Sequence, residues 1–77
     1  MNDIRGSLRE CFEAAFPAVP LSSLETLRAE RDPVWDSLAT LTLVTMVEER
    51  FGVSIPTDKI PQLLSFDAMA DYLETRH

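Results

Sequence analysis

The apolar residues between positions 37 and 51 recur at helical spacing, and this pattern constrains the fold more than any other feature of the chain. It is the longest uninterrupted helical pattern in the 77 residues. Asp36 precedes the pattern and can accept hydrogen bonds from the free amides of a first helical turn. Gly52 follows it and can take the left-handed conformation that often ends a helix. The sequence therefore predicts a helix over about 37–51.

This predicted helix carries more apolar surface than a single core stripe needs. Leu43, Val47 and Phe51 share one face, with Met46 beside them, and they are expected to fill the core. A second face carries further apolar and small polar side chains, which are Leu38, Leu41 and Thr45. We therefore expect part of the apolar surface of this helix to stay exposed after the core has formed.

The same helical periodicity appears in three other segments. It predicts a helix over about 3–16, capped by Asn2 or Asp3, and a last helix over about 66–76, capped by Ser65. A short helix over about 57–63 is expected between them, with Thr57 as its cap. Strand-like alternation does not persist anywhere in the sequence. The chain is therefore expected to form an all-α bundle of three longer helices and one short helix.

A long crossover loop, about 17–36, separates the first two predicted helices. Pro17, Pro20 and Pro33 interrupt any regular element there. The loop is long for a structureless connection in so small a domain. Leu24 and Leu27 follow a pair of serines and suggest a short helical turn pinned by the two leucines. We therefore expect an ordered crossover.

Composition narrows the class of protein. A length of 77 residues fits one domain, which we expect to span 1–77. The formal net charge of −6 disfavours nucleic acid as a partner. The single cysteine, Cys11, reads as a core residue and fits a reducing, cytoplasmic setting better than a secreted one. No apolar run is long enough to span a bilayer, no signal peptide is suggested, and no Cys/His zinc spacing exists. We expect a monomer that binds neither a membrane nor a metal.

Ser37 is the residue with the clearest chemical potential. Its hydroxyl is expected at the exposed first turn of the helix over 37–51. Serine catalysis needs a neighbouring base, but the only histidine is the terminal His77, and nothing would orient Lys59. An Asp-Ser pair at a helix start is also common in proteins without any function there. Trp35, just before the pair, is expected to pack the end of the loop onto the bundle.

Several motifs at matching spacing resemble the acyl carrier protein family. These motifs are Asp36-Ser37-Leu38, Glu48-Glu49-Arg50-Phe51-Gly52, Val53-Ser54-Ile55-Pro56 and the run from Ser65 to Leu73. The likeness covers 35–73 without a gap. The chain differs from fatty-acid carriers just before the serine motif, where those carriers usually have a glycine and this chain has Pro33-Val34-Trp35. It also differs where Ala39 and Thr42 replace residues that are often acidic.

The resemblance implies an acyl-carrier-like bundle and a specific role for Ser37. A phosphopantetheinyl transferase would attach 4'-phosphopantetheine from coenzyme A to the Ser37 hydroxyl. The thiol of the arm would then hold an acyl or aminoacyl group as a thioester. A loading enzyme and downstream condensing, modifying or transferase enzymes would be the other partners. The chain itself would have no catalytic residue. The partner-docking face that the resemblance implies consists of Asp36, Leu38, Leu41, Thr45 and Glu48.

Two other functions remain open at the level of sequence. A helical adaptor would bind a protein through the same helix without any modification of Ser37. A small serine hydrolase would use Ser37 as a nucleophile and would react with a fluorophosphonate probe. Because no base is available to Ser37, labelling by that probe is not expected.

Overall fold

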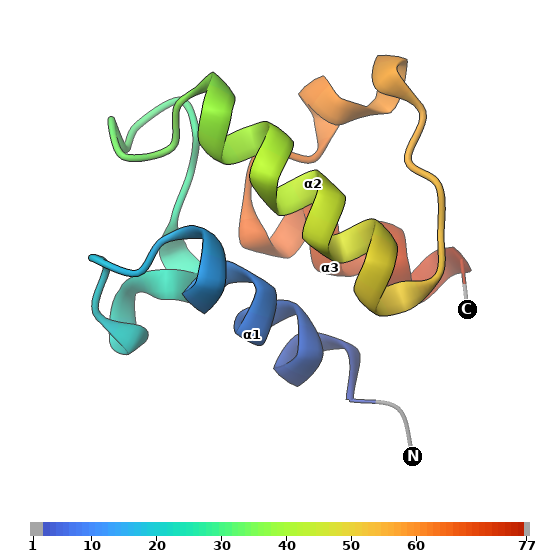
Figure 1. The fold of residues 1–77 in the computed structure, drawn as a ribbon, viewed down its shortest axis with the longest axis horizontal. Helices are drawn as coiled ribbons and strands as arrows, with labels where there is room; N and C mark the ends of the chain where they lie inside the picture. The colour runs from blue at the N-terminus through green and yellow to red at the C-terminus, as the bar shows by residue number, and fades with distance from the viewer. Residues whose placement is uncertain (1–2, 77) are drawn as a thin grey trace.

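A computed structural model of the chain describes residues 3–76, which fold as helices joined by turns and short extended links (Figure 1). Within this range no strand forms, and an isolated bridge pairs Arg28 with Ser65. The predicted all-α bundle is confirmed. The two short helices are 3-10 helices, labelled η. The elements are α1 (Ile4–Ala15), η1 (Leu21–Thr26), α2 (Ser37–Phe51), η2 (Thr57–Gln62) and α3 (Phe66–Arg76).

Helix α1 organises the bundle by packing against α2, α3 and η1, while α3 also packs against η1. Figure 1 shows α2 running across the front of the molecule, with α3 behind it and α1 below it. The shortest dimension of the Cα trace is 18 Å, which corresponds to two layers of helix. The start of α2 lies at one end of the bundle, next to the crossover (Figure 1).

One contiguous apolar core joins the helices. From α2 it takes Leu43, Val44 and Val47, with Met46 and Phe51 only partly buried, close to the expected stripe. The spare apolar surface is also present: Leu38 is 72% exposed and Leu41 is 61% exposed. The largest fully buried side chains come from α1, η1, α2 and α3 and from Phe16, which follows α1; they are Phe12, Phe16, Phe66, Leu8, Leu24, Leu43, Met69, Leu73 and Val47.

Most of the predicted helix ends are confirmed. Asp3 caps α1 by accepting from Gly6 N–H, and Ser65 Oγ accepts from Ala68 N–H at the start of α3. Asn2 lies outside the described residues. Gly52 ends α2 with φ of 65°, a left-handed conformation that costs glycine little.

The expected cap at Thr57 is wrong. Thr57 is the first residue inside η2, Pro56 occupies the capping position, and no side chain of residues 3–76 caps this helix. The carbonyl of Pro56 instead accepts from Lys59 N–H at 2.9 Å, which closes a 3-10 turn directly after the proline.

The crossover between α1 and α2 is ordered, as its length suggested. The predicted turn forms η1, and Leu24 and Leu27 are buried beneath it. Ala29 N–H then donates to Leu64 O at 3.0 Å, which ties the loop to the start of α3. The backbone N–H of Arg28 donates to Asp32 Oδ2 at 2.9 Å and closes a local turn. The loop therefore brings the chain to α2 along a defined path.

No helix among residues 3–76 is both long enough and apolar enough to cross a membrane.

Candidate functional site

Ser37 is the first residue of α2 and lies on the surface. The carboxylate of Asp36 accepts from Ala39 N–H at 2.8 Å, so the cap just before Ser37 is closed as expected. Within residues 3–76 the Ser37 hydroxyl forms no hydrogen bond with another residue. Its oxygen is therefore accessible to a reacting group from outside the chain.

A shallow cleft of about 320 Å³ opens directly beside Ser37. It lies between the first turns of α2 and the second half of η2, and Ile60, Pro61 and Leu64 form its far side. Thr40 and Leu41 continue the wall that Ser37 begins. The serine hydroxyl thus lies at the edge of a largely apolar depression.

Trp35 packs the end of the crossover into the bundle, as expected. Its side chain is buried, and its ring meets that of Phe12 edge-on at 5.4 Å and that of Phe16 at 5.3 Å. The indole Nε1–H also donates to Thr40 Oγ1 at 3.0 Å. The sequence analysis did not predict this role of Thr40. The one available signal was its position four residues after Asp36 and five after Trp35.

The exposed face of α2 carries the predicted docking residues Leu38, Leu41 and Thr45. Their spacing of three and four places them in one row along the helix. The Thr45 hydroxyl donates to Leu41 O, and the Thr42 hydroxyl donates to Leu38 O, each at 2.9 Å. Because both hydroxyl protons are used within the helix, this face presents mainly methyl and methylene groups.

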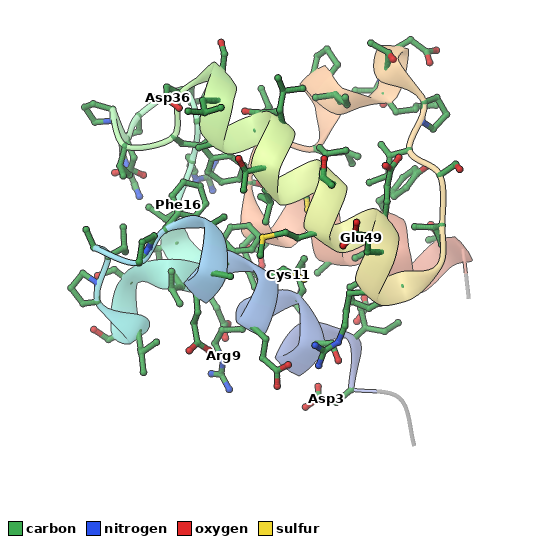
Figure 2. The ribbon with its side chains drawn as sticks, in the orientation of Figure 1. Asp3, Arg9, Cys11, Phe16, Asp36 and Glu49 are labelled. Carbon is green, nitrogen blue, oxygen red and sulfur yellow. The ribbon has the colours of Figure 1, made fainter. Side chains whose placement is uncertain are left out.

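The two carboxylates assigned to the same face are both engaged with backbone amides. Asp36 caps the helix, and Glu48 is half-buried with Oε2 accepting from Ile55 N–H at 2.7 Å. The Glu48 bond holds the extended link after Gly52 against the end of α2. In Figure 2, Asp36 lies at the start of α2 and Glu49 near its other end. Sequence reasoning did not foresee the structural bond of Glu48.

Charges elsewhere form exposed ion pairs away from Ser37. Arg5 meets Asp67 at 3.2 Å, and Arg9 meets Glu25 at 3.5 Å, between elements that pack together. Exposed pairs of this kind contribute little stability. In the crossover, the hydrogen bond from Arg28 N–H and then the Arg31 side chain lower the pKa of the Asp32 carboxyl.

Cys11 is buried on α1, as predicted (Figure 2). It borders a groove of about 330 Å³ that also includes Met46 and Arg50 of α2. Burial raises the pKa of the Cys11 thiol. Among residues 3–76 no cluster of three or more His, Cys, Asp or Glu side chains suits a metal ion. The exposed serine at the start of α2, beside the apolar cleft, is therefore the candidate functional site.

Residues 35–73 match the family model described as a phosphopantetheine attachment site. This segment covers half of the chain and contains Ser37, the cleft and all of α2. The protein belongs to this phosphopantetheine-binding family of acyl-carrier type, whose prosthetic group is covalent 4'-phosphopantetheine. Neither the curated proteins nor the solved structures gave a match.

Proposed function

We propose that Ser37 carries the 4'-phosphopantetheine arm and that the chain presents acyl or aminoacyl groups, held as thioesters on that arm, to biosynthetic enzymes. The observation that carries the proposal is the exposed, unbonded hydroxyl of Ser37 at the start of α2, inside the matched segment. A phosphopantetheinyl transferase supplies the arm from coenzyme A. The chain contributes no catalytic group, and it acts in the reducing cytoplasm as a monomer.

The surroundings of Ser37 fit a phosphodiester. An anionic group at the N-terminus of a 15-residue helix is favoured by the helix dipole and by the free amides of the first turn. The adjacent cleft offers Ile60, Pro61 and Leu64 to the apolar parts of an arm. The serine side chain is already exposed, so its modification requires no buried group to move.

The other serines of the matched segment support the choice of Ser37. Ser65 is only partly exposed and its oxygen accepts from Ala68 N–H, so modification there would remove the cap of α3. Ser54 is exposed, but it lies in the extended link between α2 and η2 and does not begin a helix. Ser37 alone among the three combines exposure, a helix N-terminus and a neighbouring cleft.

We further propose that partner enzymes dock on the face of α2 formed by Leu38, Leu41 and Thr45, flanked by Asp36 and Glu48. The two leucines offer the apolar contact at this face, because Leu38 and Leu41 are both largely exposed. The partners proposed for this face are the transferase, a loading enzyme and the downstream condensing, modifying or transferase enzymes. The transferase must reach Ser37 itself, and the other enzymes must reach the arm attached to it, so all of them approach the part of the surface around the start of α2.

The test is the reaction of the purified chain with a promiscuous phosphopantetheinyl transferase and coenzyme A, followed by intact-protein mass spectrometry. The wild type should gain the mass of one arm, and Ser37→Ala should gain none. Ser54→Ala is the matched control, because it removes another exposed serine of the matched segment and should gain one arm. An unmodified but folded wild type, or a modified Ser37→Ala, would refute the assignment and favour an unmodified helical adaptor.

A further inference from the structure

Three consecutive hydrogen-bonding groups link the buried tryptophan to the start of α2. The indole Nε1–H of Trp35 donates to Thr40 Oγ1 at 3.0 Å. The Thr40 hydroxyl in turn donates to the carbonyl oxygen of Asp36 at 3.1 Å. That same carbonyl also accepts the backbone N–H of Thr40 at 3.0 Å. The Asp36 carbonyl is therefore held by two bonds.

The carbonyl of Asp36 belongs to the peptide unit that continues into Ser37. A peptide unit is planar, so fixing the carbonyl oxygen also fixes the direction of the Ser37 N–H and the position of its Cα. Ser37 has no side-chain bond of its own within residues 3–76. Its hydroxyl is thus positioned through the backbone, and that backbone is held by Thr40.

We call the hydrogen bonds from Trp35 to Thr40 and from Thr40 to the Asp36 carbonyl the relay. The Trp35 end of the relay is held in place by core packing. Trp35 is only 4% exposed and lies against Phe12 of α1 and Phe16 just after it, so the indole cannot reorient without disturbing the aromatic core. Its backbone N–H also donates to Asp32 O at 3.0 Å. Packing against α1 therefore sets the orientation of the indole N–H. Through Thr40, this N–H in turn helps to hold the start of α2.

Thr40 differs from the other threonines of α2 in this respect. The hydroxyls of Thr42 and Thr45 make the same bond to the carbonyl four residues earlier. Neither accepts a bond from another side chain within residues 3–76, and both are exposed, whereas Thr40 is half-buried. A threonine in a helix does not need to accept a side-chain hydrogen bond in order to be stable there. We therefore relate the bond from Trp35 to Thr40 to the segment that it spans, which contains Asp36 and Ser37.

We propose that Thr40 and Trp35 are positioning residues for modification of Ser37: together they orient the Asp36–Ser37 peptide so that the hydroxyl is presented to the transferase in one geometry. This inference rests on the proposed role of Ser37. Orientation of a nucleophile affects the turnover step, whereas residues that only dock a partner affect affinity. The relay is therefore expected to act on kcat, and the exposed leucines on KM.

The experiment compares Thr40→Val, Thr40→Ser and Thr42→Val in steady-state transfer of the arm from coenzyme A. Valine keeps the shape of threonine but removes the hydroxyl, so Thr40→Val should lower kcat by about 3–10-fold with KM unchanged, the loss expected for one or two hydrogen bonds. Thr40→Ser retains the hydroxyl and should stay within about twofold of the wild type. Thr42→Val, which removes an equivalent helix bond, should keep the wild-type kcat.

A second readout needs no arm. The chain has one tryptophan, so its nitrogen-15 spectrum contains one indole N–H signal. In unmodified protein, Thr40→Val should shift this signal, speed its exchange with solvent and shift the Ser37 amide. Thr42→Val should leave the indole signal in place. Trp35→Phe should lower kcat as Thr40→Val does, and the double variant should be no slower than the slower single variant, because both break one relay.

The outcomes separate the two proposals. A modified wild type with full kcat in Thr40→Val, or a Thr40→Ser as slow as Thr40→Val, would overturn the positioning role. Equal slowing by Thr40→Val and Thr42→Val would also overturn it. If the folded wild type took up no arm, the proposed function would fail instead. The two NMR signals would then test the positioning role by themselves. Unchanged Ser37 amide and indole signals in Thr40→Val would overturn it.

Discussion

Two leucines on α2, two residues apart, should separate folding from partner recognition. Leu43 is fully buried, and Leu41 is 61% exposed. Truncating a buried leucine to alanine costs about 2–5 kcal/mol through lost burial and the cavity left behind. At about 0.05–0.15 kcal/mol per residue, a chain of 77 residues has roughly 4–12 kcal/mol in total. Leu43→Ala should therefore remove a large share of the stability.

Leu41→Ala should have the opposite profile. Most of its surface is already in water, so the change in unfolding free energy should stay within about 0.5 kcal/mol. Burying a whole leucine side chain is worth about 1.5–3 kcal/mol, and 61% of that is roughly 1–2 kcal/mol on docking. The value of kcat/KM for arm transfer should accordingly fall by about 5–30-fold, mainly through KM.

The assay pairs urea unfolding, followed by circular dichroism, with transferase kinetics under conditions where both variants are folded. Leu41→Ala should unfold at the wild-type urea midpoint yet transfer slowly at low carrier concentration. Leu43→Ala should unfold at a much lower midpoint. The account of the α2 face would be refuted if Leu41→Ala lost as much stability as Leu43→Ala, or if it kept the wild-type kcat/KM.

Three further predictions concern groups away from the attachment point. Glu48→Ala should lower the unfolding free energy by about 1.5–3 kcal/mol, because Ile55 N–H loses a charged acceptor, while Glu48→Gln keeps an acceptor and should lose less in the same urea titration. Native Cys11 should resist alkylation at neutral pH until urea is added, since burial raises the pKa of its thiol; rapid labelling of folded protein would contradict this. The pKa of Asp32 is lowered in the fold, so its stabilising effect is present above about pH 4 and is lost as pH falls through the folded pKa. The amide signal of Arg28, which donates to this carboxylate, should then shift in acid in the wild type and shift much less in Asp32→Asn.

Local patterns in the sequence account for much of this fold. The spacing of apolar residues predicts the bounds of α2, and Asp36, Gly52 and Ser65 mark helix ends because capping depends on residues within one turn. The exposure of the Ser37 hydroxyl follows directly from its place at the start of a helix. The exposed Leu38 and Leu41 follow from the same periodicity, since a helix can bury only one face in a bundle of this size.

Contacts between segments were less accessible to sequence reasoning. The bond from Ile55 to Glu48 depends on how the link after α2 folds back, and the bond from Trp35 to Thr40 depends on the packing of α1. Thr57 has the chemistry of a cap, but the turn closes one residue earlier, on the carbonyl of Pro56. In each case a polar group has several possible hydrogen-bond partners nearby. The folded arrangement of the backbone determines which of them lies within bonding distance.

Localising the arm to one residue shows whether Ser37 is the attachment point. Trypsin cleavage after Arg31 and Arg50 releases the peptide 32–50, which contains a single serine, Ser37, among the six of the chain. After transfer from coenzyme A, fragmentation of this peptide should place the whole added mass on Ser37. An arm found on another residue, or a peptide 32–50 that stays unmodified while the intact protein gains mass, would contradict the account.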